Sequence, residues 1–278
     1  DCLSYCLEGH PERPQRVGAT LELLEANAES FSWGAFEAAS EIALLRAHSK
    51  EHLERLKEPR PFDADTAYFE GIYDLARLAT GAALAAMESA LNGDSAFSLM
   101  RPPGHHAESS RAMGFCYLNH IAIAAREALK RGLGRVAVWD LDAHHGNGTE
   151  AILKGVENAL YVSAHQHPCY PGTGIVSESN CLNFPVSPQT EADAHMATLR
   201  RSWEAILEFE PQLVLVSAGF DAYEWDPLTQ MKLRVEDYKT LGSWIGEAKL
   251  PTAGILEGGY SDDLPLLVDA FLNGWENA

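Results

Sequence analysis

The sequence has few of the features that mark membrane, secreted or disulfide-rich proteins. None of its uninterrupted apolar runs reaches the roughly 18 residues that a membrane-spanning helix needs. No charged and then apolar leader follows Asp1, so no secretory signal peptide is predicted. The sequence therefore predicts a protein that does not enter a membrane.

Cysteine is scarce and unevenly spread. The five cysteines, an odd number at irregular spacings, are Cys2, Cys6, Cys116, Cys169 and Cys181. This pattern does not indicate a disulfide framework, although Cys2 and Cys6 are near enough in the sequence to pair. We expect free thiols and a cytoplasmic location.

Basic residues are also few. The 278 residues include 21 Lys and Arg against 40 Asp and Glu, which gives a formal net charge of −19. Direct binding to nucleic acid through phosphate contacts is therefore not expected. The acidity favours cationic substrates or partners, although a need for solubility explains it equally well.

Strand-like and helix-like segments alternate along the chain. Buried strands are predicted at 96–100, 135–140, 159–164, 212–217 and 252–256. Helices are predicted around 17–24, in short pieces over 40–56 with Ser40 and Ser49 as N-caps, then at 71–91, 119–130, 191–209, 235–248 and 263–275, with a short helix capped by Thr149. With 46% hydrophobic residues, this alternation predicts one α/β domain over residues 1–278, in which helices cover both faces of a mostly parallel sheet.

Groups that carry chemistry follow the predicted strands. They are the pair His105-His106, the run Asp140 to His144, Asp221, and Tyr260. In parallel sheets, ligands bind beyond the carboxyl ends of the strands, so these groups should share one edge. Because side chains alternate along an extended chain, Asp140, Asp142 and His144 would point to the same side and offer oxygen and nitrogen ligands to a divalent cation.

Taken singly, these residues are weak evidence. A lone aspartate such as Asp221 also serves as a helix cap, and Gly258-Gly259 is also compatible with a simple tight turn. Isolated histidines are usually structural, which is our interpretation of His48, His52, His167 and His195. Only the convergence of the groups at one sheet edge favours a functional site.

Several motifs in a fixed order carry a family resemblance. They are Arg101-Pro102-Pro103-Gly104-His105-His106, Gly114-Phe115-Cys116, Asp140-Leu141-Asp142-Ala143-His144-His145-Gly146-Asn147-Gly148-Thr149, Tyr170-Pro171-Gly172-Thr173-Gly174, Ser217-Ala218-Gly219-Phe220-Asp221-Ala222 and Leu256-Glu257-Gly258-Gly259-Tyr260. On these motifs the chain resembles the zinc-dependent histone deacetylase family, on the class II-like side shared with bacterial deacetylases and acetylpolyamine amidohydrolases. The resemblance covers essentially the whole chain and implies the arginase/deacetylase-like α/β fold.

The resemblance also implies a catalytic centre. One Zn²⁺, or Fe²⁺ in its place, would be held by Asp142, His144 and Asp221, and three protein ligands leave a position open, as catalytic zinc requires. His106 would be the general base, His105 an electrostatic or acid partner, and Tyr260 a donor to the developing oxyanion.

The resemblance assigns a partner to each of the two histidines. Asp140 would orient His105, and Asn147 would orient His106. An aspartate makes its imidazole more basic, whereas an asparagine adds no charge. We therefore hypothesise that His106 stays neutral near pH 7 while His105 is more readily charged.

A channel and a second ion follow from the same resemblance. Its substrate-binding residues would be Gly114, Phe115, Tyr170, Leu228 and Gly258, with weaker matches for Arg16 near an internal tunnel and Asp65 at the rim. A structural K⁺ would be bound by Asp140, Asp142, His144, Ser163 and Ala164. The bulky Trp225 lies in the sequence where it could narrow the mouth.

The expected reaction is hydrolysis of an acetyl amide on a lysine side chain, in a peptide or protein. Acetylpolyamines or other acetylated small amines are the alternative substrates: Leu228 replaces the acidic gatekeeper of polyamine-specific members, although Glu224 lies nearby. A binuclear manganese hydrolase is disfavoured because Gly146 and Tyr223 stand where bridging ligands would be needed. A catalytically inactive scaffold is the remaining alternative, but no catalytic residue is missing.

Overall fold

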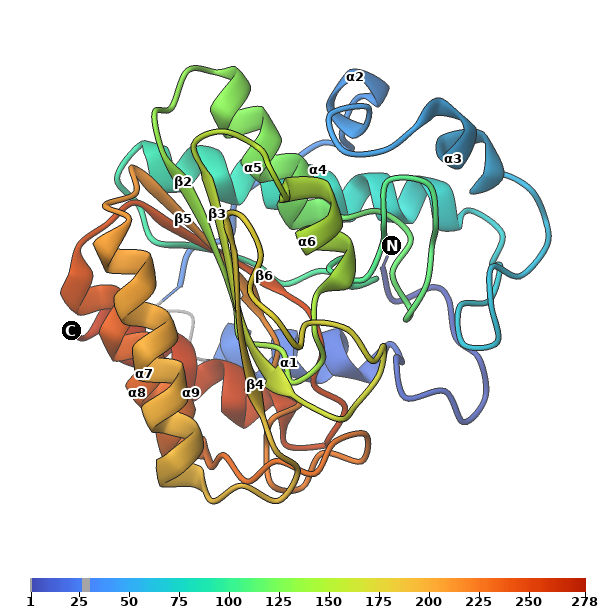
Figure 1. Ribbon diagram of the computed structural model, residues 1–278. Coiled ribbons are helices and arrows are strands. Elements are labelled where there is room, and N and C mark those ends of the chain that lie inside the picture. Colours follow the sequence, from blue (N-terminus) through green and yellow to red (C-terminus); the bar gives the residue numbers. More distant parts are fainter. Residues whose placement is uncertain (1, 27–30) are drawn as a thin grey trace.

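The computed structural model describes residues 2–26 and 31–278, with a parallel sheet at its centre (Figure 1). Its strands are β1 Ala96–Ser98, β2 Val136–Asp140, β3 Ala159–Gln166, β4 Cys181–Val186, β5 Leu213–Ala218 and β6 Thr252–Leu256. They lie in the order β1-β6-β5-β2-β3-β4, and each neighbouring pair is parallel. The parallel α/β architecture predicted from the sequence is confirmed.

Helices cover both faces of this sheet (Figure 1). On one face lie α2 Glu41–Leu44, α3 Lys50–Arg55, α4 Ile72–Leu91, α5 His120–Lys130 and α6 Asn147–Leu153. On the other lie α1 Gln15–Ala26, α7 Ala192–Glu208, α8 Val235–Ala248 and α9 Leu264–Glu276. Coverage of both faces explains why the central strands are continuous apolar runs and not alternating patterns.

The alternation of side chains along β2 divides the core into two clusters. Val136 and Val138 pack among the residues of α2 to α5, whereas Ala137 and Trp139 pack against the opposite layer. All five residues of β2 are buried. The strand is therefore fixed in register from both sides, and its last residue, Asp140, is placed with it.

The topology of the sheet places one pair of strand ends at the centre of the molecule. From β2 the chain proceeds outward through β3 to β4 and then crosses back to β5, which lies on the other side of β2. In open parallel sheets, ligands bind at such a reversal of strand order. Asp142 follows β2 and Asp221 follows β5, so both lie at this point.

Most predicted elements agree with the structure to within two residues at each end. Ser40 and Ser49 cap α2 and α3 through their side chains, as expected. The first strand is shorter than predicted and ends at Ser98, and β4 was not predicted at all. Thr149 is not a cap: α6 begins at Asn147 after Gly146, and the Thr149 hydroxyl instead bonds to Asn119.

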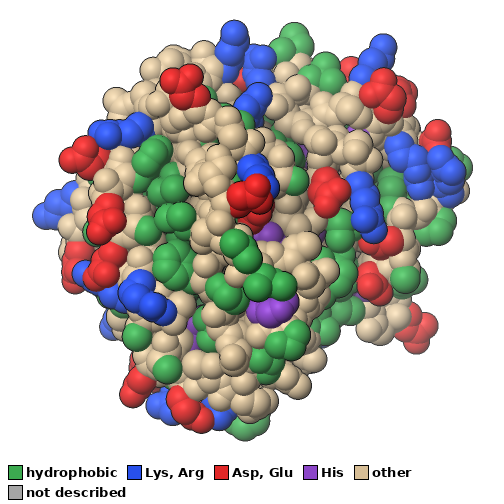
Figure 2. Space-filling model, in the orientation of Figure 1, with side chains coloured by type: hydrophobic (Ala, Val, Ile, Leu, Met, Phe, Trp, Pro, Cys, Tyr) green, Lys and Arg blue, Asp and Glu red, His purple; other side chains and the backbone are tan. Residues whose placement is uncertain are grey.

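Two further expectations concern the chain as a whole. The cysteines, all within the described residues, are free thiols. In the described part of the chain, no helix combines the length and the apolar character that crossing a membrane requires. On the face shown in Figure 2, acidic and basic side chains are interspersed without a continuous patch of one sign.

Candidate metal centre and active site

Three buried side chains converge at the carboxyl ends of β2 and β5. Asp142, His144 and Asp221 each offer one ligand atom, and these atoms lie within 4.8 Å of one another. Nδ1 of His144 is 2.6 Å from Oδ2 of Asp221 and 3.2 Å from Oδ1 of Asp142. Two carboxylate oxygens and one imidazole nitrogen suit a divalent transition metal, and three protein ligands leave room for water and substrate.

The backbone approaches these ligands closely at two glycines. A Cβ atom on Gly219 would lie 2.4 Å from Asp142 atoms, and one on Gly258 would lie 2.5 Å from Oδ2 of Asp142 and 2.8 Å from Oδ2 of Asp221. The amide of Gly258 donates to Oδ2 of Asp142 at 2.7 Å. A side chain at either position would displace a ligand, so the glycines are needed for the geometry.

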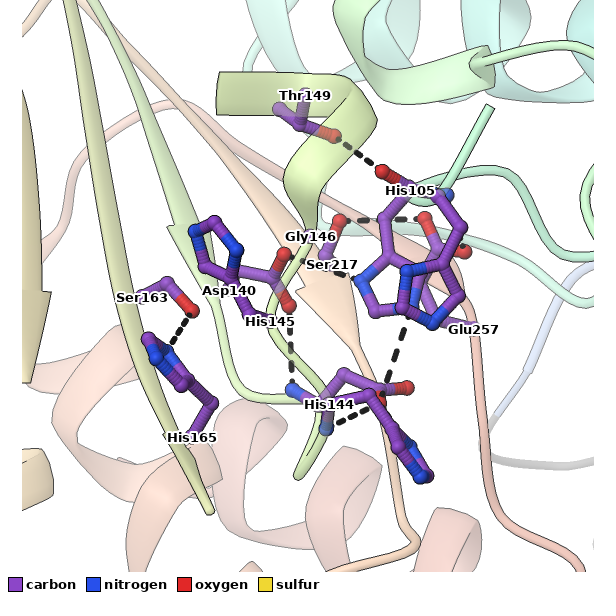
Figure 3. Close-up of polar contacts among 12 residues, drawn as sticks. His105, Asp140, His144, His145, Gly146, Thr149, Ser163, His165, Ser217 and Glu257 are labelled. Carbon is purple, nitrogen blue, oxygen red and sulfur yellow. Dashed lines mark hydrogen bonds and ion pairs between the residues drawn. The ribbon is translucent and has the colours of Figure 1, made fainter. Parts of the chain in front are cut away.

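The structure corrects the placement of Asp140. The alternation argument placed its side chain with Asp142 and His144, but Asp140 is not one of the three clustered ligands, and its carboxylate lies toward His105 (Figure 3). Its Oδ2 lies 3.2 Å from Nδ1 of His105 and accepts a hydrogen bond from the Tyr161 hydroxyl at 2.9 Å. Strand alternation failed because β2 ends at Asp140 and the following residues leave the extended conformation.

His106, the second histidine of the pair, has an amide partner. Nδ1 of His106 lies 2.9 Å from Oδ1 of Asn147, and the rings of His105 and His106 are 4.1 Å apart. Both rings are buried. The structure thus brings each histidine to the partner that the sequence predicted for it.

The two rings have opposite electrostatic environments. Burial alone would lower the pKa of His105, but the carboxylates of Asp142 and Asp140 raise this pKa to about 10. Burial, together with the positive charges of His105 and His144, moves the pKa of His106 well below its ordinary value. One ring is therefore suited to carry a proton and the other to accept one.

A pocket of about 410 Å³ leads to the metal centre. The expected residues Gly114, Phe115, Tyr170 and Leu228 line it, together with His106, His144, Asp65 and Tyr260. Gly258 does not line the pocket but lies behind the metal ligands. Trp225, which the sequence placed near the mouth, is 70% exposed and is not part of the lining of this pocket.

Tyr260 stands at the wall of the pocket, held through its backbone and its ring. Its amide donates to Oδ2 of Asp226 at 2.7 Å, and Gly259 adopts a φ of 116° that a residue with a side chain would rarely adopt. Arg16 donates to the carbonyl of Gly259 at 2.6 Å, and its guanidinium lies 4.7 Å from the Tyr260 ring centre. The chain on both sides of the tyrosine is therefore fixed.

Of the residues expected around K⁺, Asp140 lies on β2 and both Ser163 and Ala164 lie on the adjacent strand β3, whereas Asp142 and His144 follow the end of β2. Asp140 is in register with Ser163, and Ala164 follows. The Ser163 hydroxyl is 2.9 Å from Nδ1 of His165, on the side of Asp140 away from His105 (Figure 3).

His145, for which the sequence indicated no catalytic role, bonds to Glu150 at 2.8 Å.

The site also contains residues that the sequence did not single out. Glu257 accepts from the backbone amides of Gly104 and His105, and Glu108 accepts from the amide of Asn147. Asp226 supports Tyr260, as described above. In the sequence, the only sign of these three residues is that each is a carboxylate within or beside a catalytic motif.

The expected bridging positions of a second metal are not occupied by ligands. Gly146 has no side chain, and the Tyr223 hydroxyl donates to Asp263 at 3.0 Å. Within residues 2–26 and 31–278, the triad is the one cluster of ligand-type side chains close enough to hold a metal. This arrangement favours a single ion.

Comparisons with known proteins agree with this geometry. Residues 10–273 match the histone deacetylase domain family. A histone deacetylase-like amidohydrolase of Pseudomonas aeruginosa is 37% identical over 91% of this chain and 73% of its own length. The solved HDA15 HD domain superposes with a TM-score of 0.89 at 31% identity, covering 98% of this chain and 85% of that one. The solved acetylpolyamine aminohydrolase of Burkholderia pseudomallei superposes with a TM-score of 0.87 at 28% identity, covering 98% of this chain and 94% of that one.

Proposed function

The chain belongs to the histone deacetylase family and is an amide-hydrolysing deacetylase, and from this premise we propose that it deacetylates lysine side chains of peptides or proteins, using one Zn²⁺. The nature of the pocket lining supports this choice of substrate. Asp65 is the single carboxylate among the described residues that line the pocket of about 410 Å³. A polyamine keeps further ammonium groups after acetylation, and these need several anionic partners, whereas Asp65 is the one that the described lining offers.

The neighbouring surface pocket supports the same choice. Its volume is about 610 Å³, and it shares His10, Pro11, Leu228 and Tyr260 with the first pocket. Its lining adds Arg13 and Gln15 but no acidic side chain among the described residues. Polar donors beside the channel suit the carbonyl groups of a peptide that flanks the acetylated lysine.

The triad of Asp142, His144 and Asp221 would hold the zinc ion. Two oxygens and one nitrogen within 4.8 Å fit its ligand preference, and Fe²⁺ is the alternative ion. When bound, the metal would polarise the amide carbonyl and lower the pKa of a water molecule. A K⁺ ion would be bound by oxygens of Asp140, Asp142, His144, Ser163 and Ala164, a hard donor set suited to it.

The remaining steps belong to side chains of the chain itself. His106 lines the pocket, and we propose that it accepts the proton of the attacking water at Nε2. The new bond forms between the water oxygen and the amide carbon, and the Tyr260 hydroxyl donates to the resulting oxyanion. His105, whose pKa is raised to about 10, supplies the proton as the carbon–nitrogen bond breaks, which releases acetate and the free amine.

A panel of acyl amines tests the proposal. Purified protein of measured zinc, iron and manganese content is assayed with acetyl-lysine peptides, acetylpolyamines and free acetyl-lysine. We expect kcat/KM for at least one peptide to exceed every acetylpolyamine by about tenfold or more. Preference for an acetylpolyamine would support the alternative substrate, and stoichiometric metal without turnover of any acyl amine would support an inactive scaffold.

A further inference from the structure

We infer that Glu108 is a positioning residue that fixes the side-chain amide of Asn147 and, through it, the imidazole of His106. The inference rests on the proposed function, because the role of His106 as the base is part of it. Glu108 follows His106 by two residues, yet its side chain returns to Asn147 at the start of α6. It contacts neither the pocket nor the metal ligands, so its effect would be transmitted through Asn147.

The side-chain amide of Asn147 lies between the imidazole of His106 and the carboxylate of Glu108, which differ in the hydrogen bonds that they can make. Its Oδ1 is 2.9 Å from Nδ1 of His106, and its Nδ2 donates to Oε1 of Glu108 at 3.0 Å. An ionised carboxylate can only accept hydrogen bonds. If the amide were rotated by 180°, its oxygen would face the Glu108 carboxylate, and two acceptors would be in contact. Nδ2 also makes longer contacts, of 3.4 Å each, with the His106 carbonyl and Sδ of Met113. Glu108, the charged and nearest acceptor, therefore makes the main contribution to selecting one of the two orientations of the amide.

The selected orientation determines which nitrogen of His106 carries the proton. Because Oδ1 of Asn147 is an acceptor, Nδ1 of His106 must be the donor in the neutral ring. The lone pair then remains on Nε2, the nitrogen that a base needs free. With the amide rotated, Nδ2 would face Nδ1 and favour the other tautomer, which has no lone pair on Nε2. A carboxylate remote from the reacting atoms thus controls whether His106 can accept a proton.

The backbone of Glu108 is held in place by a third histidine. The backbone amide of Asn119 donates to Nε2 of His48 at 2.8 Å, so Nδ1 of His48 carries the proton and donates to the Glu108 carbonyl at 3.0 Å. The amide of Glu108 also donates to the carbonyl of Arg111 at 2.9 Å. These bonds fix the backbone from which the Glu108 side chain reaches Asn147.

The choice of a carboxylate at position 108 has a physical reason. A glutamine there would still have an acceptor oxygen, but it could rotate and present its own donor to Asn147. It would then permit the second orientation of the Asn147 amide. Glu108→Gln should therefore weaken the preference for one orientation of the Asn147 amide, and Glu108→Ala should weaken it further, leaving only the longer contacts with the His106 carbonyl and Met113.

A double-mutant cycle with Asn147→Asp separates this role from simple packing. In the wild-type background we expect Glu108→Ala to lower kcat about tenfold with KM within about twofold, and Glu108→Gln to have a smaller effect. In the Asn147→Asp background two carboxylates would face each other, so Glu108→Gln should raise kcat relative to Asn147→Asp alone. Glu150→Gln, at a carboxylate that pairs with His145 outside the pocket, is the matched control and should leave kcat within about twofold.

Nitrogen NMR of ¹⁵N-histidine-labelled protein gives a readout that does not need turnover. We expect the Nδ1–H tautomer alone at His106 in the wild type and a mixture of tautomers in Glu108→Ala, with the signal assigned by His106→Gln. The inference would be overturned if the tautomer of His106 were unchanged in Glu108→Ala. It would also be overturned if Glu108→Gln lowered kcat equally in the wild-type and Asn147→Asp backgrounds. A wild-type protein without turnover would overturn the proposed function instead, and the NMR result would still decide the role of Glu108. If Glu108→Ala does not fold, Glu108→Gln carries both measurements.

Discussion

The backbone amide of His105 donates to the carboxylate of Glu257 at 3.0 Å, which joins the loop of the paired histidines to the end of β6. The same carboxylate oxygen accepts from the amide of Gly104 at 2.6 Å. The other oxygen accepts from the Ser217 hydroxyl at 3.1 Å (Figure 3). Three residues after Glu257 the chain reaches Tyr260. One buried side chain therefore fixes the position of the histidine loop relative to the tyrosine.

Glu257 should make the stability of the protein fall as the pH rises. Burial raises its pKa from 4.5 to about 7, although the positive charge of His105 and the amide of Gly104 lower it. Between these two values the folded state keeps a proton that the unfolded chain loses, so stability decreases through this interval, by about 3 kcal/mol in total. Glu257→Gln keeps an acceptor oxygen without the charge. We expect it to be more stable than the wild type at pH 8 and equal to it near pH 4, below both pKa values, measured by urea unfolding at constant zinc.

Comparing Glu257→Ala with Glu257→Gln measures a second contribution of this residue, the hydrogen bonds that hold the histidine loop. The alanine variant leaves the buried amides of Gly104 and His105 without an acceptor, at about 1–3 kcal/mol each. It should be less stable than the wild type at every pH, and its kcat should fall because the histidine loop loses its anchor. Equal behaviour of the glutamine and alanine variants would mean that the carboxylate does not hold the loop.

The fold could be predicted largely because its central strands are covered on both faces. The strand Leu213–Ala218 begins with four apolar residues and leads to polar groups at its carboxyl end, so both its existence and its chemistry are visible in the sequence. The strand Cys181–Val186 could not be recognised, since Asn183 and Pro185 interrupt its pattern. Proline is tolerated there because the strand forms an edge of the sheet.

The site was predictable where residues belong to ordered motifs and not where contacts depend on the path of a loop. The partners of His105 and His106 follow from the family resemblance, and the structure brings them together. Glu108 reaches Asn147 only because the loop after His106 turns back toward α6. Sequence spacing contains no information on such a return.

A buried ion network should make the protein sensitive to acid. Glu12 binds Arg101 through both carboxylate oxygens, at 2.7 and 2.6 Å, and Arg16 at 3.2 Å. Burial alone would raise the pKa of Glu12, but the two guanidinium groups lower it below 4.5. Its stabilising contribution is therefore complete above pH 4.5 and is lost as the pH falls through the lower folded value. We expect Glu12→Gln to lower the free energy of unfolding by about 3–5 kcal/mol at pH 7, because two buried cations lose their anionic partner. The unfolding free energy of this variant should also decrease less steeply than that of the wild type as the pH falls.

The exposed pair of Glu88 and Arg131 provides the control for this prediction. Its N–O distance is 2.7 Å, close to that of the buried pair, but its side chains are 50% and 41% exposed. Glu88→Gln should change the unfolding free energy by about 1 kcal/mol or less. A loss as small as this in Glu12→Gln would show that the buried network contributes no more than a surface ion pair.

Metal binding should distinguish the two adjacent histidines His144 and His145. His144 belongs to the triad with Asp142 and Asp221, whereas His145 bonds to Glu150. We expect His144→Ala to reduce bound zinc well below one equivalent and to lower kcat/KM at least about 1,000-fold. His145→Gln should keep one equivalent of zinc, even where it lowers stability. Metal analysis after dialysis, with activity measured before and after added zinc, checks both; a stoichiometric ion in His144→Ala would contradict the assignment of the ligand.

The side chain at position 228 should decide between peptide and polyamine substrates. Leu228 lines both pockets and is 38% exposed, so a carboxylate placed there would face the entering substrate while remaining partly solvated. We expect Leu228→Glu to raise kcat/KM for acetylpolyamines about tenfold and to lower it for acetyl-lysine peptides, because the free ammonium groups of the polyamine gain an anionic partner. Leu228→Gln introduces a side chain of the same shape as glutamate but without the charge. It should lower kcat/KM for acetyl-lysine peptides without raising kcat/KM for acetylpolyamines. If charge is the cause, the gain shrinks at 0.5 M salt, a concentration at which charges near the surface are screened over about 4 Å. A gain that persists at high salt, or that appears equally in Leu228→Gln, would mean that the size of the channel and not its charge selects the substrate.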